Sequence, residues 1–254
     1  GQTKRFWCIS PNRKLFIAVI FPQTKKMGQS KSKPKLLVFD FDSTIVDISH
    51  SCRCATKKTV EFFLGRLLED SAIKNVHGHC IPDFYDSSDQ LLQEQGSSFR
   101  KDAIIKKFQE YYVGRNYNGY ILDEQCLLKE VILKKLKRHK LAIISDRPVR
   151  EALFVLKRFN IDGFFDEIAG NELPGEGPPK KDHLLKLLQN LKGTKKETVF
   201  ISGNPAGIKL SQDLHLPFIG IVPPAFEKER FKSNMVDKGA NLILDQIQDI
   251  PKIF

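Results

Sequence analysis

The sequence has no apolar run long enough to cross a membrane as a helix. The longest run near the start, residues 15–21, is followed by Pro22, whereas a spanning helix needs about 20 apolar residues. Cysteine is also scarce, with five in 254 residues, an odd number in a chain long enough to build its own core. We therefore expect no membrane span and no disulfide framework, and an intracellular location, cytoplasmic or mitochondrial.

Acidic side chains are absent from the first 39 residues, which carry nine basic ones. The whole chain has 41 Lys and Arg against 30 Asp and Glu, so removing these nine leaves 32 basic and 30 acidic residues. A nearly neutral globule with a basic leader differs from a uniformly basic nucleic-acid binder. Direct binding of nucleic acid is therefore disfavoured.

The basic leader, residues 1–34, has three interpretations that composition does not separate. It is an import presequence, an extension upstream of a start at Met27, or an arm that binds an anionic partner. A start at Met27 would place Gly28 to Ser32 in the Met-Gly-x-x-x-Ser pattern of N-myristoylation.

Short apolar runs recur from Lys35 onward, each with the length of a buried β-strand. They lie at residues 36–39, 141–144, 198–201, 218–222 and 242–244. Amphipathic stretches separate most of them, at residues 126–138, 148–159, 182–191 and 206–214. Strands that alternate with helices predict an α/β domain with a parallel sheet.

A long insertion separates the first apolar run from the second. Residues 48–122 contain helical patterns at 59–68 and 101–112 but no convincing buried strand, and they are too many for a simple crossover. We predict a helical cap over the carboxyl end of the first strand. The expected parts are a leader (1–34), an α/β core (35–47 and 123–254) and the cap (48–122).

Polar residues follow the predicted strands. Asp40 and Asp42 follow the first strand, Ser145 follows the second, and Lys180 precedes the helix expected at 182. Because parallel sheets bind ligands at the carboxyl ends of their strands, we expect these side chains to gather there. One carboxylate can attack phosphorus while the other protonates the leaving oxygen. The lysine and hydroxyl would hold phosphate oxygens, with Mg²⁺ offsetting charge repulsion.

The order of these residues resembles the motifs of the haloacid dehalogenase superfamily of phosphohydrolases. Residues 37–44, Leu-Val-Phe-Asp-Phe-Asp-Ser-Thr, look like its first motif, hhhDxDx[TV]. Ile143-Ile-Ser145 looks like the second motif, and Lys180 in Pro-Pro-Lys-Lys-Asp looks like the third. The resemblance covers about residues 35–249 and is strongest to the phosphoglycolate-phosphatase-like subgroup, whose cap follows the first motif.

This resemblance implies a Rossmann-like core with an inserted cap and assigns a role to each motif residue. Asp40 would be the nucleophile and Asp42 the general acid and base. Ser145 and Lys180 would bind the phosphate. Mg²⁺ would bind the Asp40 carboxylate and the Asp42 carbonyl group.

The fourth motif of the family, hhhGDxxxD, departs from its pattern here. The aligned residues 199–207 place Gly203 and Gly207 at the two acidic positions. The resemblance implies that the first acid is a metal ligand and that the second supports the metal or the lysine. The magnesium site is therefore expected to be weakened. The side chains that could compensate are those of Asp146, Asp182 and Asn204.

Two hypotheses of function follow. The first is Mg²⁺-dependent hydrolysis of a small phosphorylated metabolite, which the cap selects. The second is a catalytically inactive pseudophosphatase, a binding or structural subunit of a larger assembly that docks to a protein or anionic partner through its leader.

Two further clusters in the sequence have ordinary explanations. The basic run at 134–140 is expected to be a solvated helix end that complements the helix dipole. The histidines and cysteines of the insertion depart from common zinc spacings, so we expect ordinary cap residues. These are His50, Cys52, Cys54, His77, His79 and Cys80.

Overall fold

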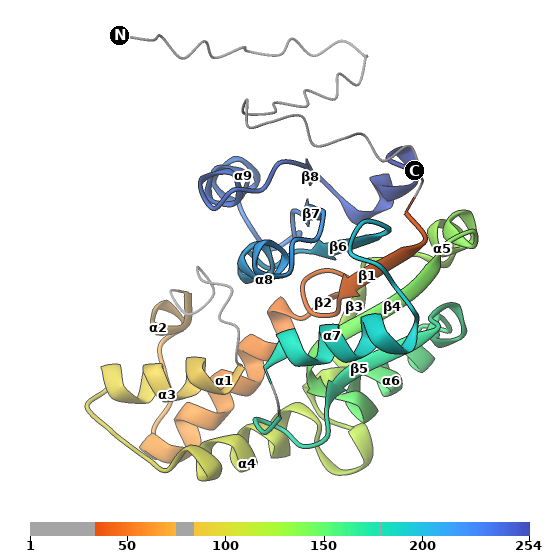
Figure 1. Cartoon of the computed structure of the whole chain (residues 1–254). Helices are drawn as coiled ribbons and strands as arrows, with labels where there is room; N and C mark the ends of the chain where they lie inside the picture. Colours follow the sequence, from red (N-terminus) through yellow and green to blue (C-terminus); the bar gives the residue numbers. More distant parts are fainter. Residues whose placement is uncertain (1–33, 75–83, 178) are drawn as a thin grey trace, which may run out of the picture.

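The computed structural model describes residues 34–74, 84–177 and 179–254 (Figure 1). Most of the basic leader, including Met27, lies outside these residues, as do His77, His79 and Cys80. In the described part, no helix has the length and hydropathy needed to span a membrane.

A six-stranded sheet forms the centre of the molecule, with strand order β5-β4-β1-β6-β7-β8. All neighbouring strands are parallel, as the sequence predicts. The strands are β1 (Leu36–Asp40), β4 (Lys140–Pro148), β5 (Glu167–Asn171), β6 (Thr198–Ser202), β7 (Phe218–Ile221) and β8 (Ile243–Leu244). Every residue of β1 is buried because it lies between two strands and under helices on both faces.

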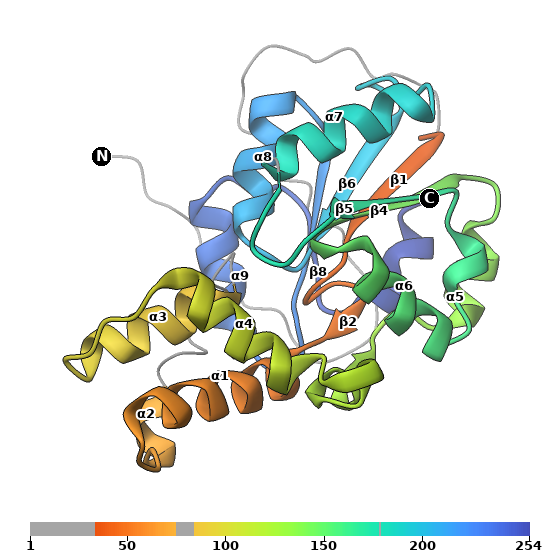
Figure 2. The same cartoon turned by 90° about the horizontal axis from the view of Figure 1, so that it is seen from below.

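Helices cover both faces of the sheet (Figure 2). They are α5 (Glu130–Leu136), α6 (Val149–Arg158), α7 (Lys180–Asn190), α8 (Ala206–Leu214) and α9 (Lys228–Asp237). Side chains alternate across a strand. Leu36 and Val38 of β1 therefore pack with leucines of α7 and α8, while Leu37 and Phe39 pack with apolar residues of α5 and α6.

A separate group of helices lies in the sequence between β1 and β4, the first two strands of the six-stranded sheet. They are α1 (Ser49–Leu64), α2 (Asp70–Lys74), α3 (Phe84–Glu94) and α4 (Lys101–Tyr112). These helices gather at one end of the molecule (Figure 1). The described residues between Ser49 and Tyr112 contain no strand, as expected for the insertion. The chain enters and leaves it through β2 (Val46–Asp47) and β3 (Gln125–Cys126), which pair antiparallel.

Several predicted boundaries are wrong for local reasons. The helix expected at 59–68 begins at Ser49 and ends at Leu64, because Gly65 adopts a left-handed φ of 64° and donates to the Glu61 carbonyl. The helix expected at 126–138 begins only at Glu130, since Cys126 pairs with Val46 in a strand.

The remaining elements are short 3-10 helices: η2 (Arg115–Tyr117), η3 (Tyr120–Asp123), η4 (Asp162–Phe164) and η5 (Ile247–Lys252). The residues of η5 contribute to the core under the sheet through Ile247 and Ile250. The segment containing η3 leads from α4 back to β3, and so it joins the inserted helices to the sheet.

Candidate active site

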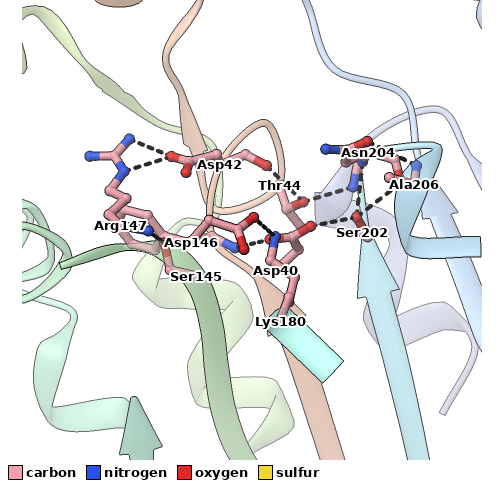
Figure 3. A network of polar contacts seen from close by, with 12 residues as sticks. Asp40, Asp42, Thr44, Ser145, Asp146, Arg147, Lys180, Ser202, Asn204 and Ala206 are labelled. Carbon is pink, nitrogen blue, oxygen red and sulfur yellow. Dashed lines mark hydrogen bonds and ion pairs between the residues drawn. The ribbon is translucent and has the colours of Figure 1, made fainter. Parts of the chain in front are cut away.

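Asp40 ends β1, and its buried carboxylate is fully engaged by neighbouring groups (Figure 3). Oδ1 accepts hydrogen bonds from the Phe41 amide and from Lys180 Nζ, both at 3.0 Å. Oδ2 accepts a hydrogen bond from Ser202 Oγ at 2.9 Å. Two predicted site residues, Asp40 and Lys180, thus meet from 140 positions apart in the sequence. Their chemical roles remain predictions.

Lys180 stands at the start of α7 and bridges two carboxylates. Its Nζ lies 2.6 Å from Asp146 Oδ2 in addition to its contact with Asp40. Burial opposes the charge of Lys180, but the two carboxylates outweigh it and raise the pKa of the ammonium group. Asp146 therefore supplies the anionic partner that Gly207 cannot provide to the lysine.

Asp146 lies within β4 and is held by Asn171 at the end of β5. Its carbonyl accepts a hydrogen bond of 2.6 Å from Asn171 Nδ2, and Asn171 Oδ1 lies 2.8 Å from His183 Nε2. Burial raises the pKa of the Asp146 carboxyl, and Lys180 opposes that shift. This support aligns Asp146 with Lys180 across the end of the sheet.

Ser145 lies within β4 rather than after it as the sequence predicts, because the strand continues to Pro148. It directly follows Ile144, the register partner of Asp40. Its side chain is buried, and its Oγ accepts a hydrogen bond of 3.1 Å from the Arg147 amide. The register places Ser145 at the same edge of the sheet as Asp40. A hydroxyl can accept from the backbone and still donate to a ligand oxygen, which suits the predicted role of Ser145.

The Asp42 side chain does not join Asp40 but points to Arg147 (Figure 3). Arg147 Nε donates to Asp42 Oδ1 at 2.8 Å, and a second guanidinium nitrogen contacts the same oxygen. The guanidinium also lies 2.9 Å from Glu124 Oε1, which accepts the Tyr112 hydroxyl. Both contacts fall on Oδ1 and hold the Asp42 side chain toward Arg147. Protonating a leaving group beside Asp40 would require this side chain to turn.

Arg147 lies at the junction between the sheet and the inserted helices. Its side chain is 1% exposed, and its guanidinium carbon lies 4.9 Å from the Phe41 ring centroid and 5.6 Å from that of Tyr112. Burial opposes its charge, but Asp42 and Glu124 raise the pKa of the guanidinium well above its usual value. Sequence reasoning missed Tyr112 and Glu124, because neither stands in a motif.

The first acidic position of the fourth motif is occupied by Gly203, and it has no space for a side chain. A Cβ atom added at Gly203 would lie 1.9 Å from the Ser43 carbonyl oxygen and 2.9 Å from its carbon. Ser43 has a left-handed φ of 58°, and the Gly203 amide donates to Thr44 Oγ1 at 2.7 Å. Glycine thus allows the loops after β1 and β6 to touch, where the family pattern has an acidic side chain.

The second acidic position of the fourth motif is occupied by Gly207, and it also lacks space for a side chain. A Cβ atom at Gly207 would lie 2.9 Å from both Cβ and Oγ of Ser202. Ser202 itself stands where the family pattern has glycine, and its hydroxyl donates to Asp40 and accepts from the Asn204 amide at 2.9 Å. The Ser202 side chain therefore occupies the space that a side chain at position 207 would need.

The residues present do not fit a Mg²⁺ ion held in the family manner. Asp40 would be the sole side-chain ligand, and its oxygens already bind Lys180 and Ser202. Of the three candidates for compensation, Asp146 binds Lys180 and Asn204 Oδ1 accepts from the Ala206 amide. Asp182 is exposed on α7. Asp146 thus compensates as the partner of Lys180, but none of the three supplies a replacement metal ligand.

Metal-ligating side chains do not cluster elsewhere in the described segments. Those segments contain no group of three or more His, Cys, Asp or Glu residues that could hold a metal ion. His50 and Cys54 are near each other on α1, with Nε2 and Sγ 3.6 Å apart, but two side chains do not complete a zinc site.

Comparisons with known proteins identify the family of the chain. The family model described as haloacid dehalogenase-like hydrolase matches residues 37–221. A protein of Caldanaerobacter subterraneus assigned as the pyrophosphatase PpaX is 26% identical over 177 residues, covering 68% of this chain and 74% of its own length. The phosphoglycolate phosphatase of Aquifex aeolicus is 25% identical over 171 residues, covering 67% and 76% respectively.

Solved structures show the same fold. A crystal structure assigned to a phosphatase from Clostridium difficile superposes with a TM-score of 0.71 at 18% identity, covering 88% of this chain and 99% of that one. Because the family model spans most of the chain, the protein belongs to the haloacid dehalogenase-like hydrolase family. Phosphatases of this family generally use Mg²⁺, so the donor set around Asp40 is a departure from the family.

A further buried carboxyl, Glu151, predicts a pH dependence of stability. Burial in the first turn of α6 raises its pKa from 4.5 to about 7, with Arg147 and Arg150 opposing the shift. The contribution of Glu151 to the free energy of unfolding is fully present below pH 4.5 and is lost as the pH rises through 7. Replacing it by an uncharged amide should remove this loss, which amounts to at most about 3 kcal/mol.

Chemical denaturation of the natural chain and Glu151→Gln at the two ends of this pH range measures the effect. The free energy of unfolding of the variant should rise relative to that of the natural chain as the pH increases. A constant difference between the two proteins would contradict the burial of an ionisable Glu151.

Proposed function

We propose that this chain is a phosphatase-fold protein without metal-dependent hydrolysis, kept as a binding or structural subunit of an assembly. The observation that carries the proposal is the contact of the two loops at Gly203. The Ser43 carbonyl oxygen occupies the space in which an acidic side chain would begin. A metal ligand at this position therefore requires the backbone to move.

The charges around Asp40 support this proposal. The acids Asp40, Asp42, Asp146 and Glu124 are joined to the bases Lys180 and Arg147 in two ion-pair groups. Acidic groups thus outnumber basic ones, and a phosphate dianion would meet net repulsion unless a cation were bound. The hydrogen bonds and ion pairs within each group are consistent with a polar network that stabilises the fold.

A second candidate function is hydrolysis of a phosphomonoester through a covalent intermediate on Asp40. The observation that favours it is the 3.0 Å contact between Lys180 Nζ and Asp40, together with relatives that bear phosphatase names. An Asp40 oxygen would bond to phosphorus as the ester P–O bond breaks, and Asp42 would protonate the leaving oxygen. Water would then cleave the acyl phosphate, with Asp42 accepting its proton.

Hydrolysis of a generic aryl phosphate separates the two candidates. The assay compares the full chain, Asp40→Asn and the control Asp182→Asn, each with and without Mg²⁺. We expect the same background rate from all three proteins. A magnesium-dependent rate that Asp40→Asn abolishes and Asp182→Asn retains would overturn the proposal and select the second candidate.

A further inference from the structure

Three segments far apart in the sequence lie side by side at the amino ends of β1, β4 and β6. The Lys140 amide donates to the Lys35 carbonyl at 2.8 Å, and the Lys35 amide donates to the Glu197 carbonyl at 2.8 Å. Lys140 Nζ reaches the Leu191 carbonyl at 3.2 Å. The beginning of β1, the turn before β4 and the loop after α7 therefore form one continuous surface.

This surface, which we call the basic face, carries seven exposed cations. They are Lys35, Lys137, Arg138, Lys140, Lys192, Lys195 and Lys196. The three segments contain one acidic residue, Glu197, which pairs with Lys35 at 2.7 Å. Two further acids contact this edge of the sheet: Asp166 accepts from the Leu141 amide, and Glu167 accepts from Asn190. The basic face therefore carries an excess of positive charge within a globule of near-neutral total charge.

Helix dipoles explain part of this charge but not all of it. Lys137 and Arg138 follow the end of α5, and Lys192 follows the end of α7, where cations are favourable. Lys195 and Lys196 precede a strand instead. Within the described segments, none of Lys192, Lys195 and Lys196 has an acidic partner within 4.0 Å. Clustered like charges repel one another, so an anionic partner would relieve this repulsion.

We propose that the basic face binds the phosphate backbone of a double-helical nucleic acid without reading its base sequence. Lysine contacts to phosphate oxygens supply sequence-independent affinity. Eight further basic residues and no acidic one precede Lys35 in the sequence, which extends the positive charge along the chain.

The neighbouring side chains favour a duplex over other polyanions. Single-strand sites present aromatic rings for stacking, and membrane-surface sites combine cations with apolar side chains. The described residues include large exposed hydrophobic side chains, but none of them belongs to the segments of the basic face (residue 35, residues 137–140 and residues 191–197). They are Phe62, Leu67, Phe99, Leu122, Val131, Leu173, Leu185 and Val236.

The basic face is independent of the candidate active site. Lys35 precedes β1 and Asp40 ends it, so the strand separates them by about 17 Å at roughly 3.3 Å per residue. A failure of the duplex proposal would therefore leave the proposed loss of hydrolysis untouched, and the converse also holds.

Binding of the full chain to random-sequence DNA and RNA duplexes tests this proposal across a range of salt concentrations. The test variant combines Lys192→Gln, Lys195→Gln and Lys196→Gln. Removing three phosphate contacts should reduce the slope of log affinity against log salt by about 2 to 3. It should also weaken binding at least about tenfold near 0.1 M salt.

The matched control combines Lys106→Gln, Lys129→Gln and Lys238→Gln. These lysines are also exposed, and they lie in or next to α4, α5 and α9. The control makes the same change in net charge, so it should bind within about twofold of the natural chain because distant charges are screened. A preference between the two duplexes would identify which nucleic acid supplies the backbone.

Three results would overturn the proposal. The natural chain could fail to bind either duplex, or both triple variants could lose affinity equally. The third is binding to phosphatidylserine vesicles that the test variant loses while no duplex is bound, which would assign the face to a membrane surface.

Discussion

The variant Gly203→Asp with Gly207→Asp, which restores both acids of the fourth motif, should be less stable than the natural chain and gain no hydrolysis. The new Cβ atoms would lie 1.9 Å from the Ser43 carbonyl oxygen and 2.9 Å from Ser202. Overpacking typically costs about 1–3 kcal/mol at each site, so we expect a total loss of about 3 kcal/mol or more.

Thermal or chemical unfolding measures this loss, and Gly163→Asp is its matched control, since a Cβ at Gly163 has no atom within 4 Å. Adding Ser202→Gly to the double variant removes the Ser202 clash but also the hydrogen bond to Asp40, and Phe200 Cε1 stays 3.1 Å from the new Cβ. It should therefore recover only some of the loss due to Gly207 and none of that due to Gly203. Magnesium-dependent hydrolysis in a double variant as stable as the natural chain would contradict the closed loop contact.

Replacing Arg147 by methionine should destabilise the protein by about 3–5 kcal/mol, the usual cost of leaving a buried charge without its partner. Asp42 and Glu124 would lose the guanidinium with which both are paired. The rings of Phe41 and Tyr112 would lose their contact with the same group. Because Glu124 is buried, its carboxyl pKa is already raised and would rise further without Arg147. The destabilisation should therefore shrink as the pH falls.

Chemical denaturation compares Arg147→Met with Arg150→Met, which removes an exposed arginine three positions later. Adding Asp42→Asn and Glu124→Gln to Arg147→Met should recover more than half of the loss, because no buried charge then lacks a partner. If Arg147→Met cost no more than Arg150→Met, the guanidinium would not be the link between the inserted helices and the sheet.

Much of the fold follows from local patterns in the sequence. The apolar runs predict β1, β6 and β7 to within one residue, whereas β4 extends four residues beyond its run at 141–144. The helices at 101–112 and 206–214 agree with α4 and α8. By contrast, β5 reads Glu167-Ile-Ala-Gly-Asn171 and is mostly half-buried, so an edge strand gives no continuous apolar signal. The polar composition of α9 concealed it in the same way.

The site was predictable in its residues but not in its contacts. Motif order predicts that Asp40, Ser145 and Lys180 share one edge of the sheet. It does not predict that Asp42 turns to Arg147, since that contact depends on a partner 105 residues away. The closure at Gly203 is equally hidden, because the obstructing atom belongs to the backbone of Ser43.

The central claim is that the contact between Gly203 and Ser43 leaves Asp40 without a metal site. The most direct test is a titration of the full chain with Mn²⁺, in which the electron paramagnetic resonance signal reports the free ion. The same titration is repeated with Asp40→Asn. The account predicts identical curves with no saturable site that depends on Asp40. A one-site curve in the natural chain that Asp40→Asn abolishes would contradict it.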